Sequence, residues 1–281
     1  MVNVVRPRKD SMSNADEELG IESLQDINGR ILRTFSVLGK VSLGIVDGHI
    51  NAAIVSGAAG CGKTHTLETA FSKAMARGKI QYDSVRGAMS PIGLYKQLYN
   101  SRNQGGVLVV DDCDSIFGDL ESLNLLKAAL DTGKRRMVHW NKESRTLEAE
   151  GIENSFEFNG AVAFITNIDF VREIARESKM APHYRALMSR CMYVDLGIHS
   201  KREILVRVSQ VILDPVFLVE NNLTKQAAGE MMKWLTANLS KLRQLSIRTI
   251  LQLVSLVKTD NDWREMAHVL MLEHRVRPNT W

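Results

Sequence analysis

One stretch of the sequence combines closely spaced glycines with a lysine and a threonine. It reads Gly57-Ala-Ala-Gly-Cys-Gly-Lys63-Thr64 and fits the pattern G-x-x-x-x-G-K-[ST]. Glycines let the backbone turn so tightly that its N–H groups can point at phosphate oxygens, and the lysine adds a positive charge for the β- and γ-phosphates. The threonine hydroxyl can ligate Mg²⁺. The pattern therefore predicts a site for a nucleotide with its magnesium ion.

The residues around this loop supply the context that it needs. It follows the apolar run INAAIVS at 50–56 and precedes a helical pattern from about Lys63 to Arg77. A strand–loop–helix order places the unpaired N–H groups of a helix N-terminus at the phosphates. Nine consecutive residues are therefore expected to contact the nucleotide: Gly57, Ala58, Ala59, Gly60, Cys61, Gly62, Lys63, Thr64 and His65.

A pair of aspartates follows a second apolar run, VLVV at 107–110. We expect Asp111 to hold the magnesium ion together with Thr64. Asp112 would act as the general base that polarises the attacking water. The run and the aspartate pair resemble a Walker B element, in which glutamate is the usual second acidic residue. The shorter side chain of Asp112 leaves open whether hydrolysis is fast or slow.

The elements that would position these residues alternate along the chain. Five segments are expected to form strands, and helical patterns separate them: 50–56, 80–85, 107–110, 161–166 and 191–196. Those at 50–56, 107–110 and 161–166 are apolar runs. Strands that are apolar on both faces and alternate with helices predict a parallel sheet covered on both sides. We therefore expect an α/β fold with a five-stranded parallel sheet, followed by a helical lid domain.

The expected organisation has four parts. Residues 1–20 are polar and without periodicity, which predicts a mobile tail, and 21–48 have apolar residues at helical spacing. The α/β nucleotide-binding domain would cover 49–198 and the helical lid domain 199–281. Alternating apolar and polar residues on both sides of a polar stretch predict a β-hairpin inserted in the first of these domains, at 135–160.

The composition limits the class of protein. Of the 281 residues, 44% are hydrophobic and 24% charged, the balance of a soluble globular protein. No apolar run approaches the length of a transmembrane helix and no secretory signal precedes the first domain, so we expect no membrane partner. Three cysteines cannot form a disulfide framework, which favours a cytoplasmic location, in the host if the protein is viral. The net charge of +4 permits a nucleic-acid partner without requiring one.

With these motifs in this order, the chain resembles the AAA+ ATPases, from about Ile50 to its C-terminus. Asn167, at the end of AVAFITN, matches the polar sensor 1 residue with which that family orients the lytic water. Arg190, in LMSRCMYVDL, looks like the arginine finger of clamp-loader-like members, and Arg185 is the alternative. Arg248, in LSIRTILQL, resembles the sensor 2 arginine. Plainer interpretations remain open, because Asn167 could cap a helix and the arginines could be ordinary surface residues.

The resemblance implies an ATPase that couples the binding and hydrolysis of ATP, with Mg²⁺, to motion between subunits. Its catalytic residues would be Lys63, Asp112, Asn167, Arg190 and Arg248. An arginine finger reaches the nucleotide of a neighbouring subunit, so the resemblance also implies a homo-oligomeric ring or spiral, commonly a hexamer in this family. The compact arrangement with its hairpin also resembles ATPases encoded by tailed phages.

The expected hairpin bears on what such a motor acts on. In one branch of the family, and in related viral helicases, a hairpin just before sensor 1 contacts nucleic acid. Four basic side chains could contact phosphates: Arg135, Arg136, Lys142 and Arg145. Trp140 and His139 could stack on bases. Equally, Trp140 and Phe156 could form a cross-strand core pair, with the charges simply solvated.

Several functions therefore stay open. Action on DNA or on a replication or recombination complex, as a helicase, helicase loader or clamp-loader-like switch, is favoured by the S-R-C arginine, the hairpin and the basic pI. A protein-remodelling chaperone would need an aromatic–hydrophobic pore loop after the second strand, and the segment RGAMSPIGLYKQLY has no such signature. A nucleotide-gated scaffold with little turnover is kept open by Asp112.

Overall fold

The computed structural model describes residues 22–273, so the expected tail at 1–20 lies outside the described residues. The chain divides into two compact units, and each is described by itself. Residues 34–198 form one, here called the α/β unit, and the described residues 22–33 and 199–273 form the other, here called the helical unit. Within the described residues, no helix is long and apolar enough to cross a membrane.

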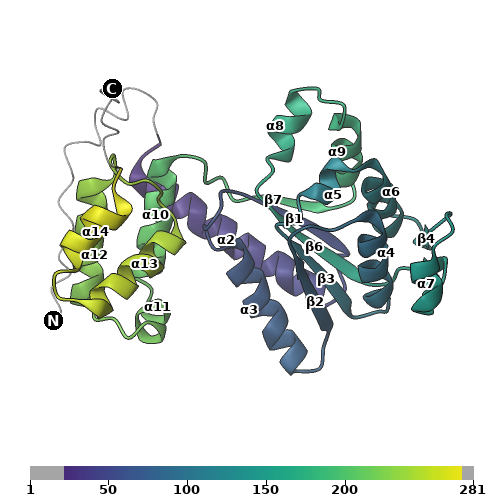
Figure 1. Ribbon diagram of the computed structural model, residues 1–281, viewed down its shortest axis with the longest axis horizontal. Helices are drawn as coiled ribbons and strands as arrows, with labels where there is room; N and C mark the ends of the chain where they lie inside the picture. Colours follow the sequence, from purple (N-terminus) through teal and green to yellow (C-terminus); the bar gives the residue numbers. More distant parts are fainter. Residues whose placement is uncertain (1–21, 274–281) are drawn as a thin grey trace, which may run out of the picture. The chain divides into compact units, whose positions relative to one another are not determined.

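A five-stranded sheet forms the centre of the α/β unit (Figure 1). Its strands, in spatial order, are β2 (Gln81–Arg86), β3 (Gly106–Asp111), β6 (Ala161–Thr166), β1 (Ala52–Ser56) and β7 (Met192–Asp195). Every neighbouring pair is parallel. All residues of β1 and β6 are buried, as strands covered on both faces must be. The α/β class and the five parallel strands predicted from the sequence are therefore confirmed.

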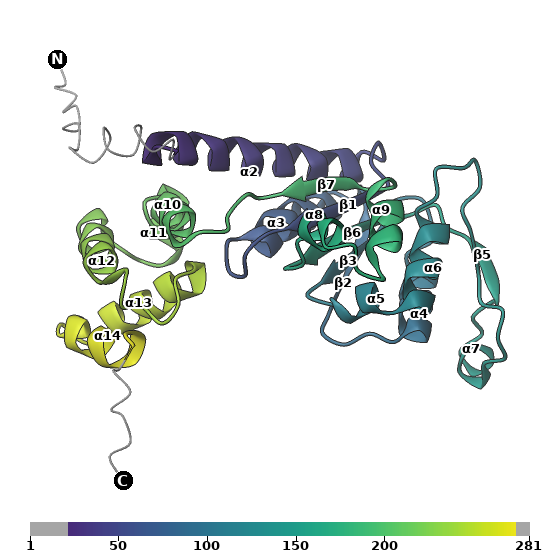
Figure 2. The same ribbon diagram turned by 90° about the horizontal axis from the view of Figure 1, so that it is seen from above.

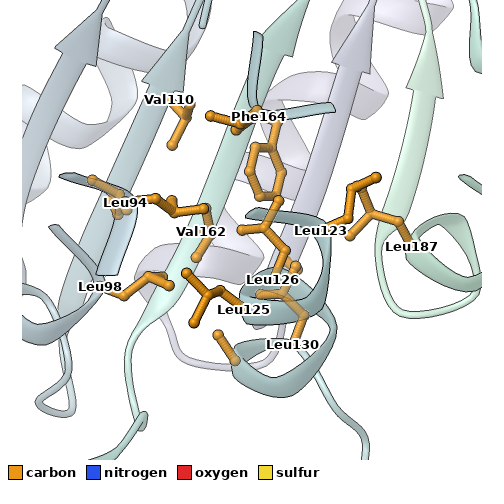
Figure 3. Close-up of a cluster of buried hydrophobic side chains, with 14 of the residues drawn as sticks. Leu94, Leu98, Val110, Leu123, Leu125, Leu126, Leu130, Val162, Phe164 and Leu187 are labelled. Atoms are coloured by element: carbon orange, nitrogen blue, oxygen red, sulfur yellow. The ribbon is translucent and has the colours of Figure 1, made fainter. Parts of the chain in front are cut away.

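Helices cover both faces of this sheet. They are α3 (Lys63–Ala76), α4 (Pro91–Asn100), α5 (Ser115–Gly118), α6 (Leu120–Ala129), α8 (Phe170–Ala175) and α9 (Ala181–Met188). Figure 2 shows α4 and α6 on one side of the sheet and the C-terminal half of α2 (Leu24–Val46) on the other. Leucines of α4 and α6 pack on alternate residues of β3 and β6, as Figure 3 shows: Leu94, Leu98, Leu123, Leu126, Val110, Val162 and Phe164. This packing fixes the sheet that carries the candidate site.

The predicted hairpin is present and contains a short helix. Strands β4 (Met137–His139) and β5 (Ser155–Glu157) pair antiparallel, with α7 (Arg145–Ala149) in the connection between them. Val138, and not Trp140, lies opposite Phe156. The rings of Trp140 and Phe156 both pack on Tyr95 of α4, with centroids 5.6 and 5.1 Å from it. The core interpretation of these two aromatic residues is therefore the better one, although they do not form the cross-strand pair itself.

The helical unit consists of helices around an apolar core. These are the N-terminal part of α2, α10 (Lys201–Ile212), α11 (Pro215–Glu220), α12 (Lys225–Asn238), α13 (Ile247–Thr259) and α14 (Trp263–Met271). Arg30 of α2 forms an ion pair with Glu203 of α10, with a distance of 2.6 Å between nitrogen and oxygen. Gln210 donates a hydrogen bond of 2.9 Å to the side chain of Asn28. Most of the segment expected to be helical at 21–48 thus forms α2, whose residues to 33 belong to the helical unit and whose residues from 34 belong to the α/β unit.

Close backbone packing at the amino ends of β3 and β6 yields a test of the fold. A Cβ atom at Gly160 would overlap the carbonyl oxygen of Ser101 and lie 2.9 Å from that of Gly106. We expect Gly160→Ala to lower the free energy of unfolding by about 1–3 kcal/mol, because backbone atoms cannot yield like a flexible side chain. Denaturant titration followed by circular dichroism measures the change.

Gly39→Ala is the matched control. It lies inside α2 with no atom within 4 Å of its added Cβ, so it should leave stability unchanged or raise it by about 0.5–1 kcal/mol. Equal stability of Gly160→Ala and the unaltered protein would contradict the packing described at this edge of the sheet.

Candidate nucleotide-binding site

The glycine-rich loop connects β1 to α3. Gly60 and Gly62 have φ angles of 70° and 100°, a region that favours glycine, and Gly62 immediately precedes the helix. A Cβ atom at Gly57 would lie only 3.1 Å from the Cβ of Leu196, which follows β7. The loop is therefore shaped by glycines at the positions predicted from the sequence, and the N-terminus of α3 opens directly from it.

Lys63, the first residue of α3, is buried against the loop, with 6% of its surface exposed. Its ammonium donates hydrogen bonds to the carbonyl oxygens of Gly57 (2.6 Å) and Ala58 (3.1 Å) and to Oδ1 of Asn167 (2.8 Å). Burial lowers the pKa of Lys63, and nearby negative groups, Asp112 among them, act in the opposite direction. A buried ammonium surrounded by oxygen acceptors is suited to phosphate oxygens, which can replace those acceptors.

Thr64 and Asp111 meet beside the lysine. The Thr64 hydroxyl donates to the Asp111 carboxylate, with oxygen–oxygen distances of 3.1 and 3.2 Å. Hydroxyl and carboxylate oxygens are the ligands that Mg²⁺ prefers, and a bound nucleotide supplies others from its phosphates. Within residues 22–273 no cluster of three or more histidine, cysteine, aspartate or glutamate side chains could hold a metal by itself. The donor set therefore fits a magnesium ion bound together with a nucleotide.

Asp112 and Asn167 complete a chain of hydrogen bonds that begins at Lys63. Nδ2 of Asn167 donates to Oδ1 of Asp112 at 3.0 Å, while its Oδ1 accepts from Lys63. Asp112 is exposed and has a left-handed backbone with φ of 52°, a conformation that aspartate adopts more readily than most residues. The structure thus brings together five of the residues predicted for the site, at the carboxyl ends of β3 and β6 and at the start of α3: Lys63, Thr64, Asp111, Asp112 and Asn167.

Arg86 also belongs to this site, and the sequence analysis did not identify it. Its Nε donates to Oδ2 of Asp111 at 2.9 Å, and another guanidinium nitrogen contacts Glu68 of α3 at 2.6 Å. Arg86 is the last residue of β2 and lies directly opposite Asp111 in the parallel register. Its position at the end of a predicted strand could have indicated a place in the site, but only with knowledge of the strand order and of the register between β2 and β3.

The two finger candidates lie elsewhere in the α/β unit. Arg190 follows α9 and bonds within its own chain, to the carbonyl oxygen of Ala186 (2.7 Å) and to Asp131 (3.4 Å). Arg185 lies on α9 and is exposed. The sensor 2 candidate, Arg248, is an exposed residue in the first turn of α13, in the helical unit.

The hairpin residues are placed unevenly for a role on nucleic acid. Arg136 is buried and donates to the carbonyl oxygens of Ala129 and Gly160, so the prediction that it contacts phosphate is wrong. Lys142 pairs with Glu121 of α6 at 2.8 Å. Arg145 is exposed at the start of α7, and Arg135 is 72% exposed beside Glu157.

Comparison with known proteins gives one relative of substantial identity. The chain is 46% identical over 247 residues to the "Uncharacterized 36.7 kDa protein in nrdC-mobD intergenic region" of Enterobacteria phage T4, covering 88% of this chain and 76% of that protein. No family model matches the sequence.

Solved structures are similar only at low identity. A DNA replication initiation factor aligns with 79% of this chain at 13% identity and a TM-score of 0.40, and the chain spans 59% of its length. Domain III of the Thermotoga maritima replication initiation protein DnaA aligns with 84% of this chain and 90% of that domain, at 12% identity and a TM-score of 0.44. The clamp-loader subtype finds no support in these comparisons.

The contact between Arg86 and Asp111 yields a prediction. Arg86→Ala leaves the buried Asp111 carboxylate without its cation, so we expect the ligand-free protein to lose about 1–2 kcal/mol of stability. Mg²⁺ and ATP should reduce this deficit, because the metal ion takes over the neutralisation of Asp111. Thermal unfolding with and without Mg²⁺ and ATP measures both effects. Arg176→Ala, which breaks an exposed pair with Glu173, should change little, and a deficit that Mg²⁺ and ATP leave unaltered would contradict the assignment.

Proposed function

The chain belongs to the same family as the 36.7 kDa protein of phage T4, and we propose that it is a phage-encoded ATPase of the AAA+ class. The observation that carries this proposal is the chain of hydrogen bonds from Lys63 through Asn167 to Asp112, beside the contact between Thr64 and Asp111. A phosphate-binding lysine, a metal-binding pair and a general base are the parts that phosphoryl transfer to water requires. The cytoplasm of the host cell would be its place of action.

Each residue then has a role that its surroundings support. Lys63 and the backbone N–H groups at the start of α3 bind the β- and γ-phosphates. Thr64 and Asp111 would hold Mg²⁺, which would neutralise charge on the phosphates. Asp112 accepts a proton from the attacking water, and Asn167 holds that water and the carboxylate in line. Asp112 is exposed in the structure, so water reaches it directly.

The site is completed, in this proposal, by an arginine from a second copy in a ring or spiral. Arg185 fits such a contact better than Arg190, since Arg185 is exposed while Arg190 is held by Ala186 and Asp131 of its own chain. Arg248 is proposed as the sensor 2 arginine. An isolated copy should accordingly turn over ATP slowly.

For the target of the motor we favour nucleic acid or a replication complex. The hairpin keeps two exposed basic side chains, Arg135 and Arg145, and the net charge of +4 is compatible with phosphate contacts. A protein-remodelling ATPase is the second candidate. It is favoured by the packing of Trp140 on Tyr95 and by the pairing of Lys142 with Glu121, which remove two of the expected nucleic-acid contacts. ATP turnover with and without single-stranded or duplex DNA distinguishes the two, since only a nucleic-acid motor is stimulated by DNA.

The role of Asp112 gives a direct test of hydrolysis. Asp112→Asn removes the base but keeps the size of the side chain and a bond with Asn167, so we expect kcat to fall by about 100-fold or more. The dissociation constant of ATP should stay within about threefold. Asp169→Asn is the control, because Asp169 caps α8 and asparagine caps equally well. Turnover at the normal rate in Asp112→Asn would exclude this base, and very low turnover in the unaltered protein, whatever the partner, would favour a nucleotide-gated scaffold.

The finger is tested by mixing two inactive variants. Lys63→Ala should bind nucleotide about 100-fold or more weakly but can offer an arginine, and Arg185→Ala can bind nucleotide but offers no arginine. We expect each to lose about 10³-fold in turnover alone and the mixture to regain a measurable part of it. Arg190→Ala should not be complemented in this way, because its loss disturbs contacts inside one copy. Recovery with Arg190→Ala and not with Arg185→Ala would reverse the assignment.

A further inference from the structure

A third carboxylate, that of Asp114, lies two residues beyond Asp112 and has no role in the proposed hydrolysis. Asp114 stands just before α5, where a side chain commonly caps the helix, but it forms no such cap. Instead its Oδ1 accepts a hydrogen bond of 2.6 Å from the hydroxyl of Thr166, the last residue of β6. Such a short bond to a carboxylate belongs to the strong class. Asp114 therefore binds the end of β6 and does not cap its own helix.

Thr166 passes this contact on to the turn that follows. The residue is fully buried, and while its hydroxyl donates to Asp114 it also accepts a hydrogen bond of 3.0 Å from the backbone N–H of Ile168. A hydroxyl has one hydrogen and free lone pairs, so both bonds can form together. The carbonyl oxygen of Ile168 in turn accepts from Ser56 Oγ at 2.6 Å. The turn is thus held from the end of β3 by Asp114 and from the end of β1 by Ser56.

Asn167 lies at the centre of this turn. Its amide oxygen faces Lys63 and its amide nitrogen faces Asp112, at 2.8 and 3.0 Å. Such a bridge works in one orientation only, because exchange of the oxygen and the nitrogen would set donors against donors at Lys63. Its geometry therefore depends on the backbone that carries it.

We propose that Asp114 is a positioning residue, which acts through Thr166 to hold Asn167 between Lys63 and Asp112. The inference rests on the ATPase function proposed above. Among the described residues, Asp114 forms no hydrogen bond with the phosphate-binding loop, although its negative charge acts to raise the pKa of Lys63. The hydrogen bonds of Asp114 therefore reach the site through Thr166 and the turn that carries Asn167. This role would explain why Asp114 accepts a hydrogen bond from Thr166 at the end of β6 and does not cap α5.

Turnover of four variants tests the inference. Asp114→Ala and Thr166→Val should each lower kcat by about tenfold or more, because a small displacement of an aligned group is costly. Asp114→Asn retains an oxygen acceptor for Thr166 and should stay within about threefold of the unaltered protein. Asp169→Ala removes a carboxylate that caps α8 without contact to Thr166, and should also stay within about threefold. A normal kcat in both Asp114→Ala and Thr166→Val would overturn the proposal.

A double variant separates positioning from a general loss of structure. If Asp114 acts through Asn167, Asp114→Ala should lower kcat little further in a protein that already carries Asn167→Ala. A full additional tenfold loss in that background would show an independent action of Asp114 and would overturn the proposal.

Hydrogen exchange tests the same contact without catalysis. In the ligand-free protein, we expect the amide of Ile168 to exchange about tenfold faster in Asp114→Ala and in Thr166→Val than in Asp169→Ala. Unaltered exchange in Asp114→Ala would contradict the inference. If the unaltered protein hydrolyses no ATP, the proposed function fails while this measurement still decides whether Asp114 holds the turn.

Discussion

The buried ammonium of Lys63 is the interaction on which the rest of the site depends. Only 6% of Lys63 is exposed, and burial of its positive charge raises the free energy of the folded state unless oxygen atoms surround the ammonium. Several segments of the chain must therefore supply hydrogen-bond acceptors to it. The structure meets it with two carbonyl oxygens of the glycine-rich loop and with the side chain of Asn167. The loop, the end of β6 and the carboxylates beside them are therefore coupled to one charge.

The order of the strands makes this coupling possible. Strand β6 lies between β1 and β3, so the ends of three parallel strands meet at one edge of the sheet. Ser56, Asp111 and Thr166 are the last residues of those strands. They and the residues that follow them form most of the hydrogen bonds of the site. Burial of β1 and β6 on both faces leaves these ends as the places where polar side chains can stand without cost. The apolar packing of α4 and α6 thus positions the strand ends that carry the polar residues of the site.

Much of the fold and of the candidate site could be predicted from local patterns in the sequence. The glycine-rich loop and the aspartate pair are contiguous, and β1, β3 and β6 contain continuous apolar runs, so these features could be predicted without knowledge of their neighbours. Arg86 could not, because it ends an edge strand with an exposed pattern and becomes relevant only through its register with Asp111. The same holds for Asp114 and Thr166, which are far apart in the chain and meet only because β3 and β6 are adjacent. Arg136 was misjudged for a related reason, since its basic side chain is used to bind two carbonyl oxygens inside the fold.

The central claim, that this edge of the sheet binds a nucleoside triphosphate through Lys63, is tested most directly by equilibrium binding of ATP in the presence of Mg²⁺. Titration calorimetry of the unaltered protein and of Lys63→Ala is the measurement. We expect saturable binding of one ATP per chain by the unaltered protein and a loss of affinity of about 100-fold or more in the variant, because a charge-assisted contact with phosphate is removed. Equal affinity in the two proteins, or no binding by either, would contradict it.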